Sequence, residues 1–190
     1  MEVSDRVTII RKGQGIGTVT TAQTNPDELA EMMVGRQVVF KTEKTAATPK
    51  ETILEVTGLN VKDNRGVDRV KDLSLTVRAG EIVGIAGIDG NGQSELIEAI
   101  TGLRKVSSGK IILKGQELTG LKPRKITESG VGHIPQDRHK HGLVLDFPIG
   151  HNIALQTYYQ SPISKGGIID YKKVDKLAEK IIQEFDVRTP

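Results

Sequence analysis

The chain has 190 residues, enough for one good-sized domain or for one domain with part of another, and its 36% hydrophobic content can build a core. No apolar run approaches the roughly 18 residues of a membrane-spanning helix, and the first residues lack the basic-then-apolar pattern of a signal peptide. The absence of cysteine excludes disulfides and thiol-ligated zinc. A net charge of +3, with 3% aromatic residues and no basic block, argues against a nucleic-acid surface.

The first elements are a predicted hairpin and a helix. Residues 7–20 alternate as two strands around a turn at Lys12-Gly-Gln-Gly15. The helix has Asn25 as its N-cap, Pro26 at its first position and Gly35 at its end. A hairpin with one helix is too small to be stable alone, so we expect residues 1–36 to be the tail of a domain that begins upstream, followed by a linker over 37–52.

The following part of the chain, residues 53–190, has the pattern of a larger domain. Residues 53–61 and 70–78 alternate as half-exposed antiparallel strands. The apolar run 82–86 predicts a buried strand, and a glycine-rich turn leads from it into a helix. The expected apolar face of that helix consists of Leu96, Ile97, Ile100 and Leu103.

The remaining elements alternate in the same way. We expect a strand at 109–115, a helix at 123–129, a buried strand at 131–135 and a helix from Asn152. A last helix, capped by Asp170, has an apolar face formed by Val174, Leu177, Ile181, Ile182 and Phe185. Strands with helices outside them place this domain in the α/β class.

The glycine-rich turn Gly87-Ile-Asp-Gly-Asn-Gly-Gln-Ser94 matches the phosphate-loop pattern G-x-x-x-x-G-K-[ST] except at Gln93, where the pattern has lysine. Its glycines allow positive φ and close approach to a ligand, and the following helix directs its free N–H groups at the same place. The Ser94 hydroxyl is placed to hold magnesium against bound phosphates. Gln93 donates a hydrogen bond without charge. Since charge-assisted bonds are about twice as strong as neutral ones, we expect phosphate binding to survive better than hydrolysis.

These residues allow other interpretations. A tight strand-to-helix turn without a ligand stays an alternative for the loop. A dinucleotide-binding fold fails on spacing, because Glu95 stands where a third glycine or alanine is required. His139 and His141 flank Lys140 without a carboxylate cluster, which makes a poor metal site. No Ser/His/Asp or Cys/His arrangement predicts a nucleophile.

With these motifs in place, residues 53–190 resemble the first part of an ATP-binding-cassette (ABC) ATPase domain. The resemblance rests on the antiparallel strands, on the loop 87–94 as a Walker A motif, and on Val131-Gly-His-Ile-Pro-Gln136 leading into the Q-loop. More narrowly, residues 86–95 and 134–138 resemble the second cassette of tandem importers for simple sugars or nucleosides, the ribose type, and residues 139–148 resemble the nucleoside or lipoprotein-linked branch. By the same resemblance, residues 1–36 look like the C-terminal tail of the first cassette. The implied fold is a partial P-loop NTPase cassette, with a mixed sheet, an antiparallel β-subdomain and flanking helices.

The resemblance implies that ATP and Mg²⁺ bind here. The implied nucleotide-binding residues are Gly87, Asp89, Gly90, Asn91, Gly92, Gln93, Ser94, Glu95 and Gln136. Ser94 and Gln136 would lie near magnesium, although Gln136 as an ordinary surface residue stays an alternative. The adenine-stacking aromatic of such cassettes would fall near residues 63–66, and its absence lowers the expected nucleotide affinity.

The resemblance also implies partners and a location. The implied partners are a membrane permease and another ABC cassette, in the same chain or in a dimer, while a substrate-binding lipoprotein would be a partner only indirectly. The implied location is the cytoplasmic face of the cell membrane. Residues 137–160 would face the permease. Five apolar side chains in this range could either contact the permease or belong to the core, and the core is the preferred assignment for each taken singly. They are Leu143, Leu145, Phe147, Tyr158 and Tyr159.

No complete catalytic site is expected in this sequence, because the resemblance puts the signature motif, the Walker B strand and the switch histidine of this cassette after residue 190. The parent protein is expected to be an ATPase with a weakly hydrolysing site at Gln93. The alternative is a cassette that hydrolyses nothing and acts as a nucleotide-sensing or structural module.

Overall fold

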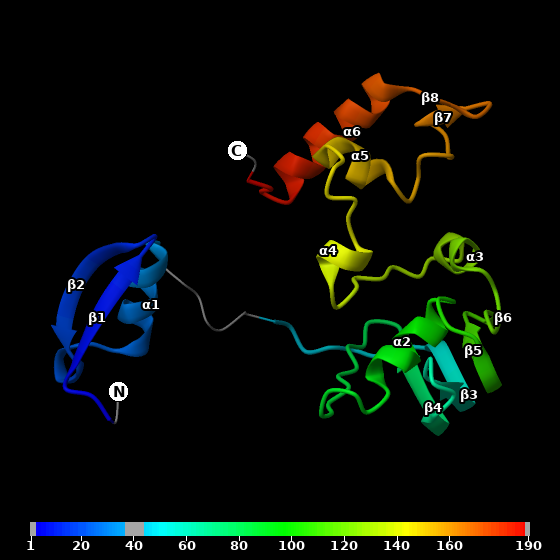
Figure 1. The fold of residues 1–190 in the computed structure, drawn as a ribbon, viewed down its shortest axis with the longest axis horizontal. Helices are drawn as coiled ribbons and strands as arrows, with labels where there is room; N and C mark the ends of the chain where they lie inside the picture. Colours follow the sequence, from blue (N-terminus) through cyan, green and yellow to red (C-terminus); the bar gives the residue numbers. More distant parts are fainter. Residues whose placement is uncertain (1–2, 37–43, 189–190) are drawn as a thin grey trace. The chain divides into compact units, whose positions relative to one another are not determined.

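The computed structural model describes residues 3–36 and 44–188 and forms two compact units (Figure 1). The first comprises Met1–Glu51 with Arg78–Ile82, and the second comprises Thr52–Val77 with Val83–Pro190. The assignment of residues 1–36 to a preceding cassette stays a prediction, and residues 37–43 of the predicted linker lie outside the described residues. Within the described ranges, no helix is long and apolar enough to cross a membrane.

The first unit contains the predicted hairpin and helix. Strands β1 (Arg6–Arg11) and β2 (Gln14–Thr20) pair antiparallel, and Lys12 and Gly13 turn the chain with φ of 51° and 78°. Two positive φ values give the turn the right-handed twist that hairpin strands need. A short 3₁₀ turn, η1 (Thr21–Gln23), leads toward the helix.

Helix α1 (Pro26–Val34) begins and ends where its caps predict. The Asn25 side chain accepts a hydrogen bond from the backbone N–H of Glu28 at 2.9 Å. Gly35, with φ of 80°, ends the helix by donating its N–H to the carbonyl of Glu31. Local capping chemistry therefore suffices to define this helix.

The second unit is built on a four-stranded sheet in the order β4-β3-β5-β6. Its strands are β3 (Thr52–Lys62), β4 (Asp68–Arg78), β5 (Val106–Leu113) and β6 (Gln116–Glu117). Strand β5 pairs antiparallel with both β3 and β6. Helices α2 (Gln93–Ile100) and α3 (Pro123–Glu128) complete this part, so the predicted α/β class is confirmed.

One core joins the sheet to these helices. Leu96 of α2 and Ile126 of α3 are each 2% exposed and pack with the apolar side chains of the strands. The buried members of this cluster are Val56, Leu59, Val61, Val70, Leu96, Ala99, Ile111, Leu118 and Ile126. The predicted apolar face of α2 is only partly buried, since Ile97 and Leu103 are exposed.

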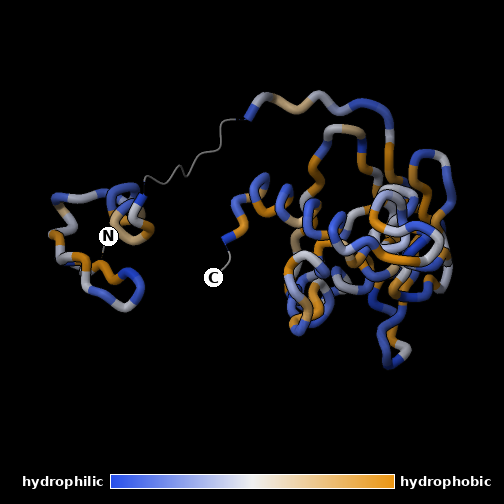
Figure 2. Tube along the Cα trace, turned by 90° about the horizontal axis from the view of Figure 1, so that it is seen from above, coloured by the Kyte–Doolittle hydropathy of each residue, from blue (hydrophilic) through white to orange (hydrophobic). Residues whose placement is uncertain are grey.

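A second, smaller cluster lies in the C-terminal part of the chain. It involves α5 (Ile149–Ala154), β7 (Ser164–Lys165), β8 (Ile168–Ile169) and α6 (Tyr171–Glu184). Val174 and Ala178 of α6 are buried, and hydrophilic and hydrophobic segments alternate along this helix in Figure 2. Asp170 stands at the N-cap, but its carboxylate forms an ion pair with Lys173 rather than a capping hydrogen bond.

Two predicted strands are wrong. Residues 82–86 and 131–135 form no strand, and Ile82 and Ile134 are 80% and 85% exposed. Their apolar patterns are those of buried strands, but a strand needs a neighbour for its backbone N–H and C=O groups. No strand of the described residues pairs with either segment, so both remain irregular.

Candidate functional site

The phosphate loop uses its glycines in two different ways. Gly90 and Gly92 have φ of 83° and 104°, in the left-handed region expected of them. Gly87 has no positive φ. A Cβ at position 87 would meet the end of the flexible Gln93 side chain, so Gly87 leaves room for the observed conformation of that side chain.

Gly92 also fixes the loop against strand β4. A Cβ at position 92 would lie 2.6 Å from the backbone carbonyl oxygen of Arg69. Gly92 is the N-cap of α2, and its own carbonyl accepts the N–H of Leu96 at 2.9 Å. Backbone therefore packs directly on backbone at the start of the helix.

Gln93 is engaged within the loop. Its Nε2 donates a hydrogen bond to the carbonyl oxygen of Ile88 at 3.2 Å. The side chain therefore folds back over the residues that would surround a phosphate. It offers the loop a neutral donor where the phosphate-loop pattern has an ammonium group.

Two cavities border the loop. A cleft of about 1090 Å³ has Gln93, Ser94 and Gln136 in its lining, together with residues 133–141, so Ser94 and Gln136 line the same cleft. A second cavity of about 580 Å³ is lined by residues 68–71 of β4 and by loop residues that include Gly87, Gly90, Asn91, Gly92 and Gln93. Of the sequence-predicted site residues described, Asp89 and Glu95 line neither cavity.

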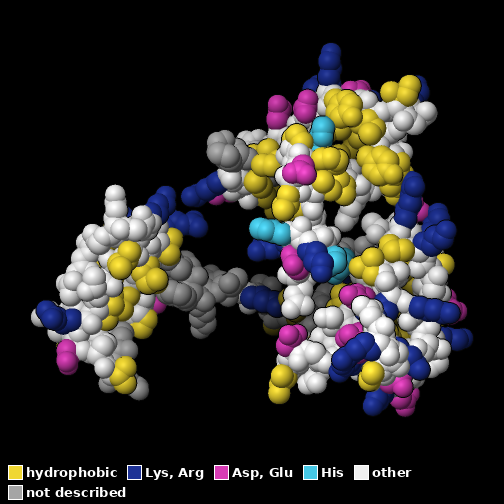
Figure 3. Space-filling model, in the orientation of Figure 1, with side chains coloured by type: hydrophobic (Ala, Val, Ile, Leu, Met, Phe, Trp, Pro, Cys, Tyr) yellow, Lys and Arg dark blue, Asp and Glu magenta, His cyan; other side chains and the backbone are white. Residues whose placement is uncertain are grey.

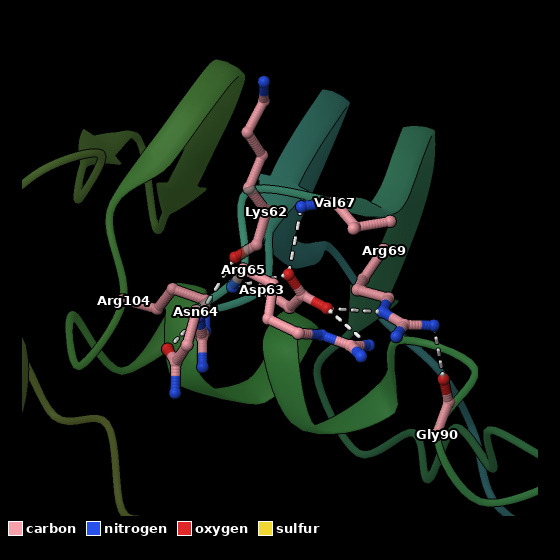
Figure 4. Close-up of polar contacts among 8 residues, drawn as sticks. All are labelled: Lys62, Asp63, Asn64, Arg65, Val67, Arg69, Gly90 and Arg104. Carbon is pink, nitrogen blue, oxygen red and sulfur yellow. Dashed lines mark hydrogen bonds and ion pairs between the residues drawn. The ribbon is translucent and has the colours of Figure 1, made fainter.

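Asp63 organises the turn between β3 and β4 (Figure 4). Its carboxylate accepts the backbone N–H groups of Arg65 at 2.9 Å and Val67 at 3.0 Å, and the Nε of Arg69 at 3.0 Å. These bonds, led by that from Val67, lower the pKa of Asp63 well below its ordinary value. An ion-paired turn thus occupies residues 63–66, where the resemblance implies an adenine-stacking aromatic residue.

This turn is tied to both ends of the loop–helix segment. Arg69 donates from Nη1 to the carbonyl oxygen of Gly90 at 3.4 Å. Beyond α2, the Nε of Arg104 lies 2.6 Å from the Glu98 carboxylate, and its Nη1 donates to the Lys62 carbonyl and the Asn64 side chain. Our sequence reasoning missed this network, although the Asp-Asn-Arg-Gly run at 63–66 is a turn signal that points to Asp63.

The stretch 137–160 begins with a short helix, α4 (Arg138–His141). Asp137 caps it by accepting the N–H of Lys140 at 3.0 Å, and this bond lowers the pKa of the Asp137 carboxyl. The preferred assignment of the apolar side chains to the core is wrong for four of the five, which are exposed: Leu143, Leu145, Phe147 and Tyr158. They follow α4 without a second layer to cover them among the described residues, and Figure 3 shows hydrophobic side chains at the surface over α5 and α6.

Tyr159 is half-buried and differs from these four. Its hydroxyl is 3.1 Å from the Glu128 carboxylate, and the guanidinium of Arg124 lies 3.4 Å from the ring centroid. The hydrogen bonds from Lys125, then Tyr159 and Arg124, lower the pKa of Glu128. His139 and His141 belong to no group of three or more potential metal ligands among residues 3–36 and 44–188.

Known proteins are similar to this chain in sequence. A family model described as ABC transporter matches residues 70–188. The guanosine import ATP-binding protein NupO of Bacillus subtilis (strain 168) is 64% identical over 99% of the chain, and the nucleoside import ATP-binding protein NupA of Lactococcus lactis subsp. cremoris (strain MG1363) is 58% identical over 98%. The ribose import ATP-binding protein RbsA of Corynebacterium glutamicum is 36% identical over 98% of the chain. The chain spans 37% of the length of the first two relatives and 34% of the third.

Solved structures share the fold. The dimeric, post-hydrolysis structure of the ATP-binding cassette MJ0796 bound to ADP and Pi superposes with a TM-score of 0.58 at 18% identity, covering 72% of this chain and 58% of that one. A nucleotide-free ATP-binding cassette from an ABC transporter gives a TM-score of 0.54 at 21% identity, covering 72% and 55%. These similarities confirm the predicted cassette fold.

Proposed function

Because the chain belongs to the ABC transporter family, we propose that it is a section of the ATP-binding subunit of a nucleoside importer, in which the loop 87–94 holds the phosphates of MgATP. Nucleosides are favoured over simple sugars by the order of identities. The guanosine and nucleoside importers are 64% and 58% identical, against 36% for the ribose importer.

The observation that carries this proposal is that Ser94 and Gln136 line one cleft beside the phosphate loop. A hydroxyl and an amide oxygen are neutral, hard ligands, which suit a magnesium ion that is held mainly by phosphate oxygens. Gly90 and Gly92 give the backbone a conformation that brings its N–H groups near a phosphate. The nucleotide-binding residues are then the loop, Glu95 and Gln136.

The neutral side chain of Gln93 supports binding with weak hydrolysis at this site. Its hydrogen bond to Ile88 also favours a second candidate, a cassette that senses nucleotide without hydrolysing it. In both cases the site binds phosphate through backbone N–H groups. The candidates differ in whether the lost ammonium group is the reason for low turnover.

The apolar side chains of residues 143–158 support a contact with a membrane permease at the cytoplasmic face of the membrane. Leu145 is 66% exposed, and Leu143, Phe147 and Tyr158 are each about half exposed. A group of exposed apolar side chains suits a protein partner better than solvent. A second cassette is a further partner in this proposal.

Calorimetric titration of MgATP tests the phosphate loop. We expect Gln93→Lys to tighten binding about tenfold, because a charge-assisted hydrogen bond replaces a neutral one. Gln183→Lys adds the same charge on the exposed side of α6 and is the matched control, with no change expected. Absence of binding by the chain and by Gln93→Lys would contradict the proposal.

In the longer protein, turnover separates the two candidates. A rise in ATP hydrolysis with Gln93→Lys supports a weakened but otherwise complete site. Unchanged hydrolysis, with tighter binding, supports the sensing module.

A further inference from the structure

Arg69 provides a positive charge beside a phosphate loop that lacks its lysine. The cavity of about 580 Å³ between β4 and the loop has two basic side chains in its lining, Arg69 and Lys71. Only Arg69 of these two has a hydrogen bond to the loop within the described residues, through Nη1 to the Gly90 carbonyl. The charge therefore lies at the loop itself.

The position of Arg69 relative to the loop is fixed at two points. Its backbone carbonyl lies against Gly92, where even a Cβ has no room. Its side chain reaches Gly90, two residues earlier in the loop, at 3.4 Å. The guanidinium itself is bonded to Asp63 and Gly90, so it needs little further ordering before it binds a ligand.

The hydrogen bond to Gly90 is long, and a better acceptor would replace it. A guanidinium has five N–H donors in a planar fork, of which Asp63 takes the one on Nε. The side chain is 32% exposed, and Arg69 lines the cavity. Phosphate oxygens are the acceptors that match this fork best.

Asp63 orients Arg69 without cancelling the local charge. Its side chain is 11% exposed and is held by the turn N–H groups as well as by Arg69. Arg65 also lies 3.4 Å from the same carboxylate oxygen, so two guanidinium groups share one carboxylate. These three side chains together carry one net positive charge.

We infer that Arg69 binds phosphate oxygens of the nucleotide in the loop and supplies the charge that Gln93 lacks, with Asp63 as its positioning residue. This inference rests on the proposed function. The part of the nucleotide that Arg69 binds is the phosphate chain, and no contact with the base is assigned to Arg69 or Asp63.

Titrations of MgATP into the whole chain test it. We expect Arg69→Gln to weaken binding at least tenfold, and Arg69→Lys to recover part of the loss, because the charge returns without the fork. Lys71→Gln removes the same charge from the same cavity and is the matched control, with less than a threefold change expected. Asp63→Asn is expected to fall between the two glutamine variants.

Replacing position 93 distinguishes a phosphate ligand from a structural residue. When Gln93→Lys restores a cation in the loop, the loss caused by Arg69→Gln should shrink to about threefold or less, since the two groups serve the same phosphate. A purely structural role predicts the same loss in both backgrounds. Arg69→Lys keeps the test decisive if Arg69→Gln does not fold, which circular dichroism reveals.

The outcomes separate the two claims. If the unaltered chain binds MgATP and Arg69→Gln weakens that binding no more than Lys71→Gln does, the role of Arg69 is overturned. The proposed function then still stands. An equal loss in both backgrounds at position 93 also overturns it. Absence of binding by the chain and by Gln93→Lys overturns the proposed function, and the role of Arg69 with it.

Discussion

The two sides of the phosphate loop are both apolar, yet they differ in structure. After the loop, Leu96 of α2 is 2% exposed and packs in the core of the sheet. Before it, Ile82 and Ile85 are 80% and 53% exposed, and residues 82–86 belong to no strand. The comparison shows that an apolar pattern gives the capacity for burial, while the available neighbours decide whether burial occurs.

The largest expected effect comes from shortening one apolar side chain on each side. Leu96→Ala should lower the free energy of unfolding by about 3 kcal/mol, because it removes buried methyl groups and leaves a cavity. Ile82→Ala should change it by less than about 0.5 kcal/mol, since the side chain is already in water. Urea unfolding of both variants measures the difference, and equal losses would show that residues 82–86 are buried in solution.

A smaller effect is expected within the loop itself. Gly92→Ala should destabilise the chain by about 2–3 kcal/mol, because its φ of 104° is strained for alanine and its Cβ would meet the Arg69 carbonyl. Gly90→Ala has the strained φ without the collision, since no atom lies within 4 Å, and should cost about 1 kcal/mol. Thermal unfolding compares the two. A Gly92→Ala variant as stable as Gly90→Ala would mean that the loop does not pack on β4.

Features that depend on neighbouring residues in the sequence were predictable. The turn at Lys12-Gly13, the caps of α1 at Asn25 and Gly35, and the phosphate loop before α2 all follow from local rules of φ and hydrogen bonding. The α/β class followed from the same elements.

Features that depend on distant partners were not predictable. Residues 82–86 and 131–135 have the composition of strands, but no sequence rule supplies the strand that must pair with them. Arg104 reaches Asn64 from 40 residues away, and no periodicity announces such a bond. The contact of Arg69 with the phosphate loop was likewise not predictable, because it depends on how β4 packs against the loop.

The smallest expected effect concerns the charge on Asp63. Its pKa is lowered in the folded chain, mainly by the bond from Val67 and then by those from Arg69 and Arg65, relative to about 3.9 in an unfolded chain. The folded state therefore binds this proton less tightly than the unfolded state does. Ionised Asp63 stabilises the fold above about pH 4, and this stabilisation is lost as the pH falls further.

Asp63→Asn removes that titration and keeps a side-chain oxygen for the turn. We expect the unfolding free energy of the unaltered chain to fall more steeply from pH 4 to pH 2 than that of the variant, as urea unfolding at each pH would show. Asp68→Asn is the control, because its carboxylate is half exposed and lies 3.9 Å from Lys62. Parallel curves for the unaltered chain and Asp63→Asn would mean that backbone bonds alone hold the turn. The ionised Asp63 carboxylate would then not hold Arg69 in place. The segments before and after the phosphate loop would differ only in how their apolar side chains pack.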